Sequence, residues 1–198
     1  LFDREKTGKG SFIDVSMLDC QIAILENAIA RYLSKKEIPE PMGSRHPSIA
    51  PFEAFKTKDS YIIIAAGNDK LFSNLCEVLK IPEVSSDERF NTNALRCENM
   101  DLLKSLFEEK LNSKNTDEWI KEMKTLKIPC GPIYNIKQAV ENPQIKERNM
   151  IVKSYHKILG EFKSAGNPIK MSTYKDSETR GNIPDLDEHR KKIIKEFS

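Results

Sequence analysis

Apolar residues recur every three or four positions early in the chain, which is the period of one face of an α-helix. They are Leu18, Ile22, Leu25, Ile29 and Tyr32. This spacing predicts a helix over residues 17–33, capped by Ser16 with Asp19 three residues on. The far side of the same helix also carries Ile24, Ala28 and Leu33. So broad a stripe predicts burial on more than one side, against other elements or another chain.

The clearest strand pattern lies between residues 52 and 65. Residues 52–56 and 61–65 predict a hairpin about the polar turn 57–60. The second strand contains the continuous apolar run YIII, which predicts a central position in its sheet.

Two further strand patterns are shorter. Residues 151–156 and 161–165 predict a second hairpin across Leu159-Gly160. Residues 11–15 alternate weakly after the turn Gly8-Lys9-Gly10 and predict a short strand.

Helical spacing returns after the first hairpin, where Gly67 and Asn68 make a turn into a helix. Two more helices follow, the second of them capped by Thr116. The predicted buried faces are Phe72, Leu75, Cys76 and Leu79, then Leu103, Leu106, Phe107 and Leu111, then Trp119, Ile120 and Met123.

The last third of the chain alternates connectors and short helices. Residues 128–133 predict a rigid, extended connector. Asn135 with Gln138 resembles a capping box, and Asn142 precedes a proline at a first helical position. A closing helix is predicted over residues 185–197, with Leu186, His189, Ile193 and Phe197 on one face.

Charge and cysteine usage exclude some classes of protein. The chain has 198 residues, with 32 Lys and Arg against 30 Asp and Glu, which argues against a nucleic-acid binder. No apolar run is long enough to span a membrane, and the first residues do not form a signal peptide. The four cysteines form no CxxC pair, which argues against a metal site. We therefore expect a reduced, soluble, cytoplasmic protein; because it begins with Leu1 within an apparent element, we expect a fragment.

The segment GSRHPS, which begins at Gly43, is the best candidate for chemistry. Arg45 and His46 stand side by side, and Pro47 forces His46 into extended backbone. An Arg–His pair on a stiff loop could hold a carboxylate or a phosphate. The alternative is a loop histidine that bonds a backbone carbonyl, and the residues alone slightly favour it. Asn68 opens a helix whose N-terminus is either a plain cap or an anion site.

Other candidate motifs favour structural interpretations. TGKG lacks the spacing of a phosphate loop and predicts a hairpin turn. We expect His156 and His189 to have structural or surface roles. We expect the thiol of Cys130 to be inert and to lie at a hinge. No Ser–His–Asp or Cys–His arrangement is legible.

Seven blocks carry a resemblance to a known family. They are TGKGSFIDVSMLD, GSRHPSIAPFEAF, YIIIAAGND, RFNTNALR, IPCGPIYNI, NPQIKERNM and LDEHRKKII. In this order and at this spacing they resemble the class III coenzyme A transferases over essentially the whole chain.

The resemblance implies an α/β fold, the C-terminal part of an interlocked homodimer. Residues 1–42 would end a large Rossmann-like domain, residues 43–127 would form a small α/β domain, and residues 128–198 would return to the large domain. Members transfer coenzyme A between an acyl-CoA and a carboxylic acid without a further cofactor.

The resemblance also implies a covalent mechanism. An Asp carboxylate attacks the thioester and forms an anhydride, and the thiolate returns to give an enzyme-bound thioester. The family's Asp would lie upstream of Leu1, so neither Asp3 nor Asp14 is assigned as nucleophile, and this chain alone is expected to be inactive. The predicted substrate-binding residues are Gly43, Arg45 and His46, together with Asn68.

Asn68 also bears on the type of reaction. The racemase branch of the family has a carboxylate at or near this position, and an amide cannot serve as its base. Asp69 is one residue away, so the racemase alternative stays open while a transferase is favoured. A non-catalytic binding module is the alternative from another class.

Overall fold

The computed structural model describes residues 1–36 and 38–197. The chain divides into two compact units, Leu1–Ile49 and Ala50–Ser198. Each unit is described below by itself. The three-part division into residues 1–42, 43–127 and 128–198 stays a prediction.

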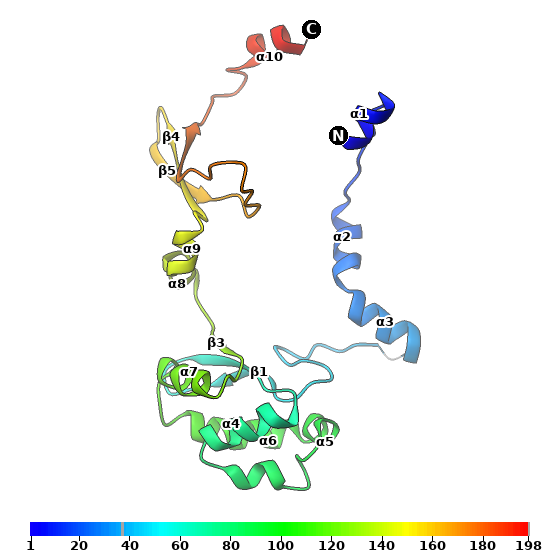
Figure 1. The fold of residues 1–198 in the computed structure, drawn as a ribbon, viewed down its shortest axis with the longest axis vertical. Helices are drawn as coiled ribbons and strands as arrows, with labels where there is room; N and C mark the ends of the chain where they lie inside the picture. The colour runs from blue at the N-terminus through cyan, green and yellow to red at the C-terminus, as the bar shows by residue number, and fades with distance from the viewer. Residues whose placement is uncertain (37, 198) are drawn as a thin grey trace. The chain divides into compact units, whose positions relative to one another are not determined.

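The first unit contains three helices: α1 (Phe2–Thr7), α2 (Met17–Ile24) and α3 (Glu26–Lys35) (Figure 1). The predicted helix over residues 17–33 is therefore present but interrupted at Leu25. There the backbone N–H of Leu25 donates to the carbonyl of Ile22, three residues back, as in a tighter turn. The predicted cap is confirmed, because the Ser16 hydroxyl accepts from the Asp19 N–H at 3.3 Å.

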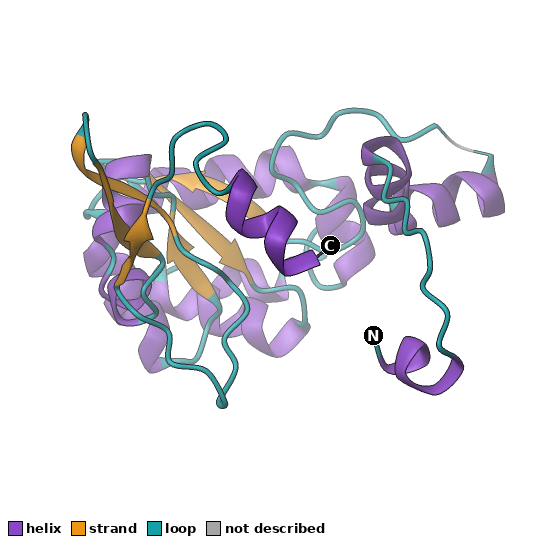
Figure 2. Cartoon of the chain, turned by 90° about the horizontal axis from the view of Figure 1, so that it is seen from above, coloured by secondary structure: helices purple, strands orange, loops and turns teal. Residues whose placement is uncertain are grey.

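The strand predicted for residues 11–15 is wrong. That segment is a loop between α1 and α2 (Figure 2), and no strand pairs with it in the described sheets. The hairpin turn predicted at TGKG is also wrong. Gly8 instead ends α1 in the left-handed conformation, at φ +69°, and its N–H donates to the Arg4 carbonyl. The weak alternation of apolar and polar residues over 11–15 does not form a strand, because no neighbouring strand pairs with it in the described sheets.

The apolar stripe predicted on α2 and α3 is present and uncovered. None of the described residues of these two helices is buried. Leu18 is 70% exposed and Ile24 is 72% exposed, where a packed side chain would be near zero. Among the other exposed apolar residues of the stripe are Ile22, Leu25, Tyr32 and Leu33. An apolar surface of this extent is typical of an interaction site.

The second unit begins with a three-stranded antiparallel sheet in the order β1-β2-β3. Strands β1 (Phe52–Lys56) and β2 (Tyr61–Ala65) form the predicted hairpin, and β2 is central as its apolar run indicated. The third strand, β3 (Cys130–Pro132), lies within the predicted connector 128–133. That connector is extended, as expected, but it also pairs with β2.

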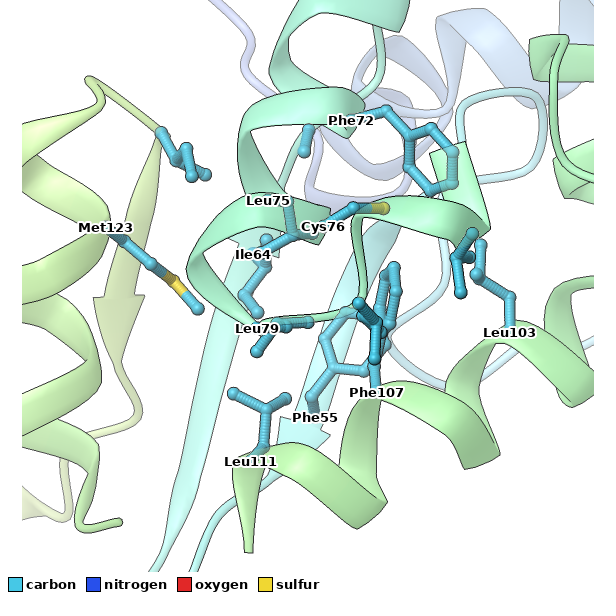
Figure 3. Packing of buried hydrophobic residues seen from close by; sticks show 14 of the residues in the cluster. Phe55, Ile64, Phe72, Leu75, Cys76, Leu79, Leu103, Phe107, Leu111 and Met123 are labelled. Carbon is cyan, nitrogen blue, oxygen red and sulfur yellow. The ribbon is translucent and has the colours of Figure 1, made fainter. Parts of the chain in front are cut away.

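Helices pack on this sheet around one apolar core. They are α4 (Asp69–Val78), η1 (Pro82–Ser86), α5 (Asn93–Glu98), α6 (Met100–Leu111) and α7 (Thr116–Thr125). The ring centroid of Phe107, on α6, lies 5.9 Å from that of Phe55 and 6.2 Å from that of Phe72. Figure 3 shows these rings within the buried cluster. Leu75, Leu103 and Phe107 are fully buried, each stabilising the fold by roughly 1.5–3 kcal/mol through the transfer of its side chain from water.

The cap of α7 differs from the prediction. Asn115 rather than Thr116 is the cap, and it forms a capping box with Glu118. Thr116 is the first helical residue, and its hydroxyl lies 2.7 Å from that of Thr57. The Asp59 carboxylate accepts from both the N–H and the hydroxyl of Thr116, which holds the pKa of Asp59 below its usual value. The cap is thus local, and Asp59 fixes the first helical residue after it.

A second sheet follows, with strand order β5-β4-β6. Strands β4 (Ile151–His156) and β5 (Gly160–Ala165) form the second predicted hairpin. The parallel strand β6 (Thr179–Asn182) was not predicted. Before this sheet, α8 (Ile136–Glu141) and α9 (Pro143–Glu147) have the two predicted caps, at Asn135 and Asn142.

The closing helix, α10 (Arg190–Phe197), begins later than the predicted residue 185. Asp187 takes a left-handed conformation at φ +66°, which interrupts a right-handed helix at that point. The side chain of Glu188 accepts from the Asp185 N–H and closes a turn instead. Among the described residues, no helix is both long and apolar enough to cross a membrane.

We predict that residues 1–198, prepared alone, self-associate at micromolar concentration through the apolar stripe of α2 and α3. Changing Leu18 and Ile22 together to Glu should weaken the association at least about tenfold, because two apolar side chains are no longer buried. Sedimentation velocity measures this. Gln21→Glu, on the same exposed helix, is the matched control and should change little. A monodisperse monomer in the unaltered chain would contradict the prediction.

Candidate substrate-binding site

The segment that holds Arg45 and His46 is an ordered turn. Gly43 has φ +65°, a conformation that favours glycine, and the Arg45 N–H donates to the Met42 carbonyl at 3.3 Å. The side chains of Arg45 and His46 are partly buried. The two predicted substrate-binding residues, Arg45 and His46, therefore have a defined backbone conformation.

One nitrogen of the His46 ring bonds the nearby backbone. Its Nδ1 accepts from the Ser48 N–H at 3.2 Å. The alternative interpretation, a histidine that bonds a backbone carbonyl, stays a prediction. Because Nδ1 accepts, the proton of the neutral ring lies on Nε2. That atom can donate to an anionic oxygen.

Ala50, the first residue of the second unit, has both of its backbone groups bonded by side chains. The Ala50 N–H donates to Oδ1 of Asn93 at 3.0 Å, and the Ala50 carbonyl accepts from Nε of Arg96 at 2.9 Å. Ala50 is itself buried, at 3% exposure. Both Asn93 and Arg96 belong to α5, so one short helix fixes both backbone groups of Ala50.

Arg96 is fully buried and each of its three nitrogens has an acceptor. Besides Ala50, it donates from Nη1 to the Phe90 carbonyl at 3.0 Å and from Nη2 to Asp69 at 2.8 Å. Its guanidinium lies over the ring of Phe72, 4.5 Å from the centroid. Arg96 thereby joins Ala50 to the beginning of α4.

The sequence interpretation missed Arg96, although a signal was present. Arg96 precedes Met100 by four residues and Leu103 by seven, which is helical spacing. Arg96 therefore lies in line with the apolar stripe that contains Leu103 and Phe107. An arginine at such a position is buried only if it is paired, which makes it a marker of a polar network.

Asn68 is the cap of α4, as one of its two interpretations expected. Its Oδ1 accepts from the Leu71 N–H at 2.9 Å, and the residue is exposed. The adjacent Asp69 carboxylate bonds Arg96, although its side chain is 77% exposed. An amide that caps a helix and a carboxylate paired with a guanidinium are poor candidates for a base that removes a proton.

The predicted residues fall into two groups. Gly43, Arg45 and His46 belong to the first unit, whereas Asn68 belongs to the second. The substrate-binding role of each of the four stays a prediction.

The remaining candidate groups have structural surroundings. Nδ1 of His156 accepts from the N–H groups of Ile158 and Leu159 at 3.2 Å each, which confirms its structural interpretation. His189 is exposed. Within residues 1–36 and 38–197, no three His, Cys, Asp or Glu side chains gather closely enough to hold a metal ion.

The thiols differ strongly in their environment. Burial raises the pKa of Cys76 to about 12, and it also raises the pKa of Cys130, which agrees with an inert thiol at that hinge. Cys20, which lies on α2, is exposed. Neither Cys76 nor Cys130 has the lowered pKa of an activated nucleophile.

A comparison of the chain with models of known protein families gives a match over most of its length. The model of the family described as CoA-transferase family III matches residues 1–190. The chain belongs to this family. The resemblance to the class III coenzyme A transferases that the sequence indicated is thereby confirmed.

Individual members of CoA-transferase family III agree. The chain is 38% identical to an acetyl-CoA:oxalate CoA-transferase of Acetobacter aceti, over 100% of the chain and 50% of that protein. It is 35% identical to the human succinyl-CoA:glutarate CoA-transferase, over 99% of the chain and 44% of that protein. The chain thus spans about half the length of these curated relatives.

Solved structures confirm the α/β fold class. A CaiB/BaiF family protein from Brucella suis matches with a TM-score of 0.78 at 34% identity, over 100% of this chain and 50% of that one. A Mycobacterium tuberculosis protein matches with a TM-score of 0.80 at 22% identity, over 98% and 49%, and supports the fold alone.

We predict that native thiol labelling at pH 8 separates Cys20 from Cys76. Cys20 is exposed and should react first with a disulfide reagent, whereas Cys76 should react only after unfolding. With a pKa near 12, only about one Cys76 in ten thousand is a thiolate at pH 8. The coloured thiolate that the disulfide reagent releases is followed with time. The slow phase of this release is assigned to Cys76 if it is lost in Cys76→Ala. Labelling of Cys76 at the rate of Cys20 in folded protein would contradict the burial.

Proposed function

We propose that the protein containing this chain transfers coenzyme A between an acyl-CoA and a carboxylic acid. The observation that carries the proposal is the family match over residues 1–190, with two relatives that are CoA-transferases at 38% and 35% identity. The poor prospects of Asn68 and Asp69 as a base favour this reaction over racemisation of a 2-methylacyl-CoA.

The proposed chemistry is covalent. A carboxylate oxygen of an Asp attacks the thioester carbonyl, and the C–S bond breaks. The thiolate of coenzyme A is released, and the acyl group stays on the enzyme as a mixed anhydride with the Asp. The thiolate then attacks the aspartyl carbonyl, which releases the donor acid and forms an enzyme-bound thioester. The acceptor carboxylate attacks this thioester, which releases the thiolate and forms an anhydride between the acceptor and the Asp. The thiolate then attacks the acceptor's carbonyl carbon, which yields the new acyl-CoA and the free Asp carboxylate. We assign this Asp to residues outside 1–198.

We assign to this chain a part in holding the acceptor. The Arg45 guanidinium presents a planar fork that suits a carboxylate, and Nε2 of His46 carries a proton that can be donated to the same anion. The relatives are named for oxalate and glutarate, which are both dicarboxylates. We therefore propose a dicarboxylate acceptor, one end of which reacts while the other is held by Arg45.

We further propose that the active protein is a homodimer in which the two chains interlock. The uncovered apolar stripe on α2 and α3 supports association, because a stable protein rarely leaves so many large apolar side chains in water.

The transfer itself is tested with the full-length gene product. Succinyl-CoA with glutarate, and acetyl-CoA with oxalate, should each be converted into the acceptor's CoA ester, which chromatography of the esters measures. Hydroxylamine added during turnover should inactivate the enzyme, because it attacks the enzyme-bound thioester or anhydride. Absence of both product and inactivation would contradict the proposal. Exchange of an α-proton of a 2-methylacyl-CoA in deuterated water would instead favour a racemase.

The role of Arg45 is tested by Arg45→Met. The KM for the acceptor should rise about tenfold, while the KM for the acyl-CoA donor should stay nearly unchanged, because the lost ion pair involves only the acceptor. Steady-state kinetics with each substrate varied in turn measure this. Arg89→Met removes an exposed arginine that pairs with Asp87 and is the matched control. Equal increases in both KM values would remove the support for Arg45.

A further inference from the structure

An open cavity of about 500 Å³ is lined by residues of α8, α9 and the second sheet, all within the second unit. Three of the lining residues are lysines: Lys146 of α9, Lys153 of β4 and Lys163 of β5. The carboxylate of Glu178 lines it as well. A cavity of this volume has the size of a small-molecule site.

Two of these lysines face each other across the sheet. Lys153 and Lys163 are directly opposite in the antiparallel pair of β4 and β5. The Lys153 N–H donates to the Glu178 carbonyl at 2.9 Å, on the β6 side, so the pair of lysines is of the kind without hydrogen bonds between its members. In such pairs the Cα atoms are only about 4.5 Å apart and the side chains are closest. Like charges directly opposite each other destabilise a sheet.

The acidic residues nearby do not balance all three lysines. Lys153 pairs with Glu178 at 3.0 Å, and Glu161 also attracts its ammonium group, so the pKa of Lys153 lies above its usual value. Among the described residues, no carboxylate lies within ion-pair distance of the ammonium group of Lys146 or Lys163. The cavity therefore contains two unbalanced positive charges, and one of them stands where it weakens the sheet.

The walls of the cavity are held in place by the chain itself. Asn149, which lines the cavity, takes a left-handed conformation at φ +47°, and its Nδ2 donates to the Asp176 carbonyl at 2.9 Å. Gly166, just after β5, comes so close that a Cβ on it would lie 2.3 Å from the Asn149 carbonyl oxygen. Walls fixed in this way need little further ordering when a ligand binds.

We propose that this cavity binds a small molecule that carries a phosphate monoester. Lys146 and Lys163 contact the phosphate, and the apolar lining residues Val140 and Ile151 contact the carbon atoms next to it. A phosphate monoester carries a charge of about −1.5 to −2 at pH 7, which balances two ammonium groups, and lysine binds phosphate as a point charge. The bound phosphate also offsets the repulsion between Lys163 and Lys153. This inference goes beyond the proposed function and does not depend on it.

Calorimetry of the full-length gene product at low ionic strength tests the site, with phenyl phosphate as the probe. Lys146→Gln and Lys163→Gln should each weaken binding at least about fivefold, because each removes one of the two unbalanced charges. Lys121→Gln, at an exposed position of α7, is the matched control and should bind as the unaltered protein does. Failure of the unaltered protein to bind phenyl phosphate, or equal affinity in all four proteins, overturns the inference.

The facing lysines give a second readout. Without phosphate, Lys163→Gln should raise the unfolding temperature slightly, because the repulsion from Lys153 is lost. With phenyl phosphate in excess, the unaltered protein should gain more in unfolding temperature than the variant does, since it binds the ligand more tightly. Scanning fluorimetry measures both temperatures. An equal gain in the two proteins would contradict a phosphate site at Lys163.

Two sources could supply the phosphate, and kinetics separates them. Coenzyme A carries a phosphate monoester on its ribose; if it is the ligand, Lys163→Gln raises the KM for an acyl-CoA but not for the corresponding ester of dephospho-coenzyme A. If a free phosphorylated metabolite is the ligand, the KM for acyl-CoA is unchanged while binding of phenyl phosphate is weakened. Either result supports the site. A protein that transfers no coenzyme A defeats the proposed function, and calorimetry still decides this inference.

Discussion

The second unit depends on one buried charge. A guanidinium removed from water costs several kcal/mol unless every part of it is bonded. Arg96 meets this condition only because three segments converge on it: Ala50, 46 residues away, Asp69, 27 residues away, and the neighbouring Phe90 carbonyl. A chain that has formed its hairpin and helices but misplaced any of the three leaves a charge unsatisfied in an apolar surrounding. The network therefore selects one arrangement of these segments, while the apolar core around Phe107 supplies most of the stabilisation.

The sequence predicted best those features that are decided within a few residues. Both hairpins and the caps at Ser16, Asn68, Asn135 and Asn142 follow from local turn and cap chemistry, and all of them are present. Each of these signals contains its own partner, so nothing distant has to agree with it.

Most of the errors lie where the partner is distant or missing. Strand β3 is only three residues long and includes a proline, so no periodicity could indicate that it pairs with β2. The alternation in residues 11–15 had no neighbour to pair with. At α7 the signal was local but was not recognised, because Asn115 and Glu118 form a capping box that the sequence interpretation overlooked in favour of Thr116. At the candidate site, Arg45 and His46 were proposed from the local sequence and their role stays a prediction, whereas the buried Arg96, whose partners are distant, was missed.

The edges of the first sheet give it a further property. Its outer strands are β1 and β3, and β3 offers a neighbour only three residues, the last of which is a proline without a backbone N–H. On strand β1 the Glu53 carboxylate pairs with Lys104 of α6, and the backbone N–H of Lys56 donates to the side chain of Glu108. Neither edge is a good template for an incoming strand. The first sheet is thus protected at both edges from being extended by a strand of a second copy.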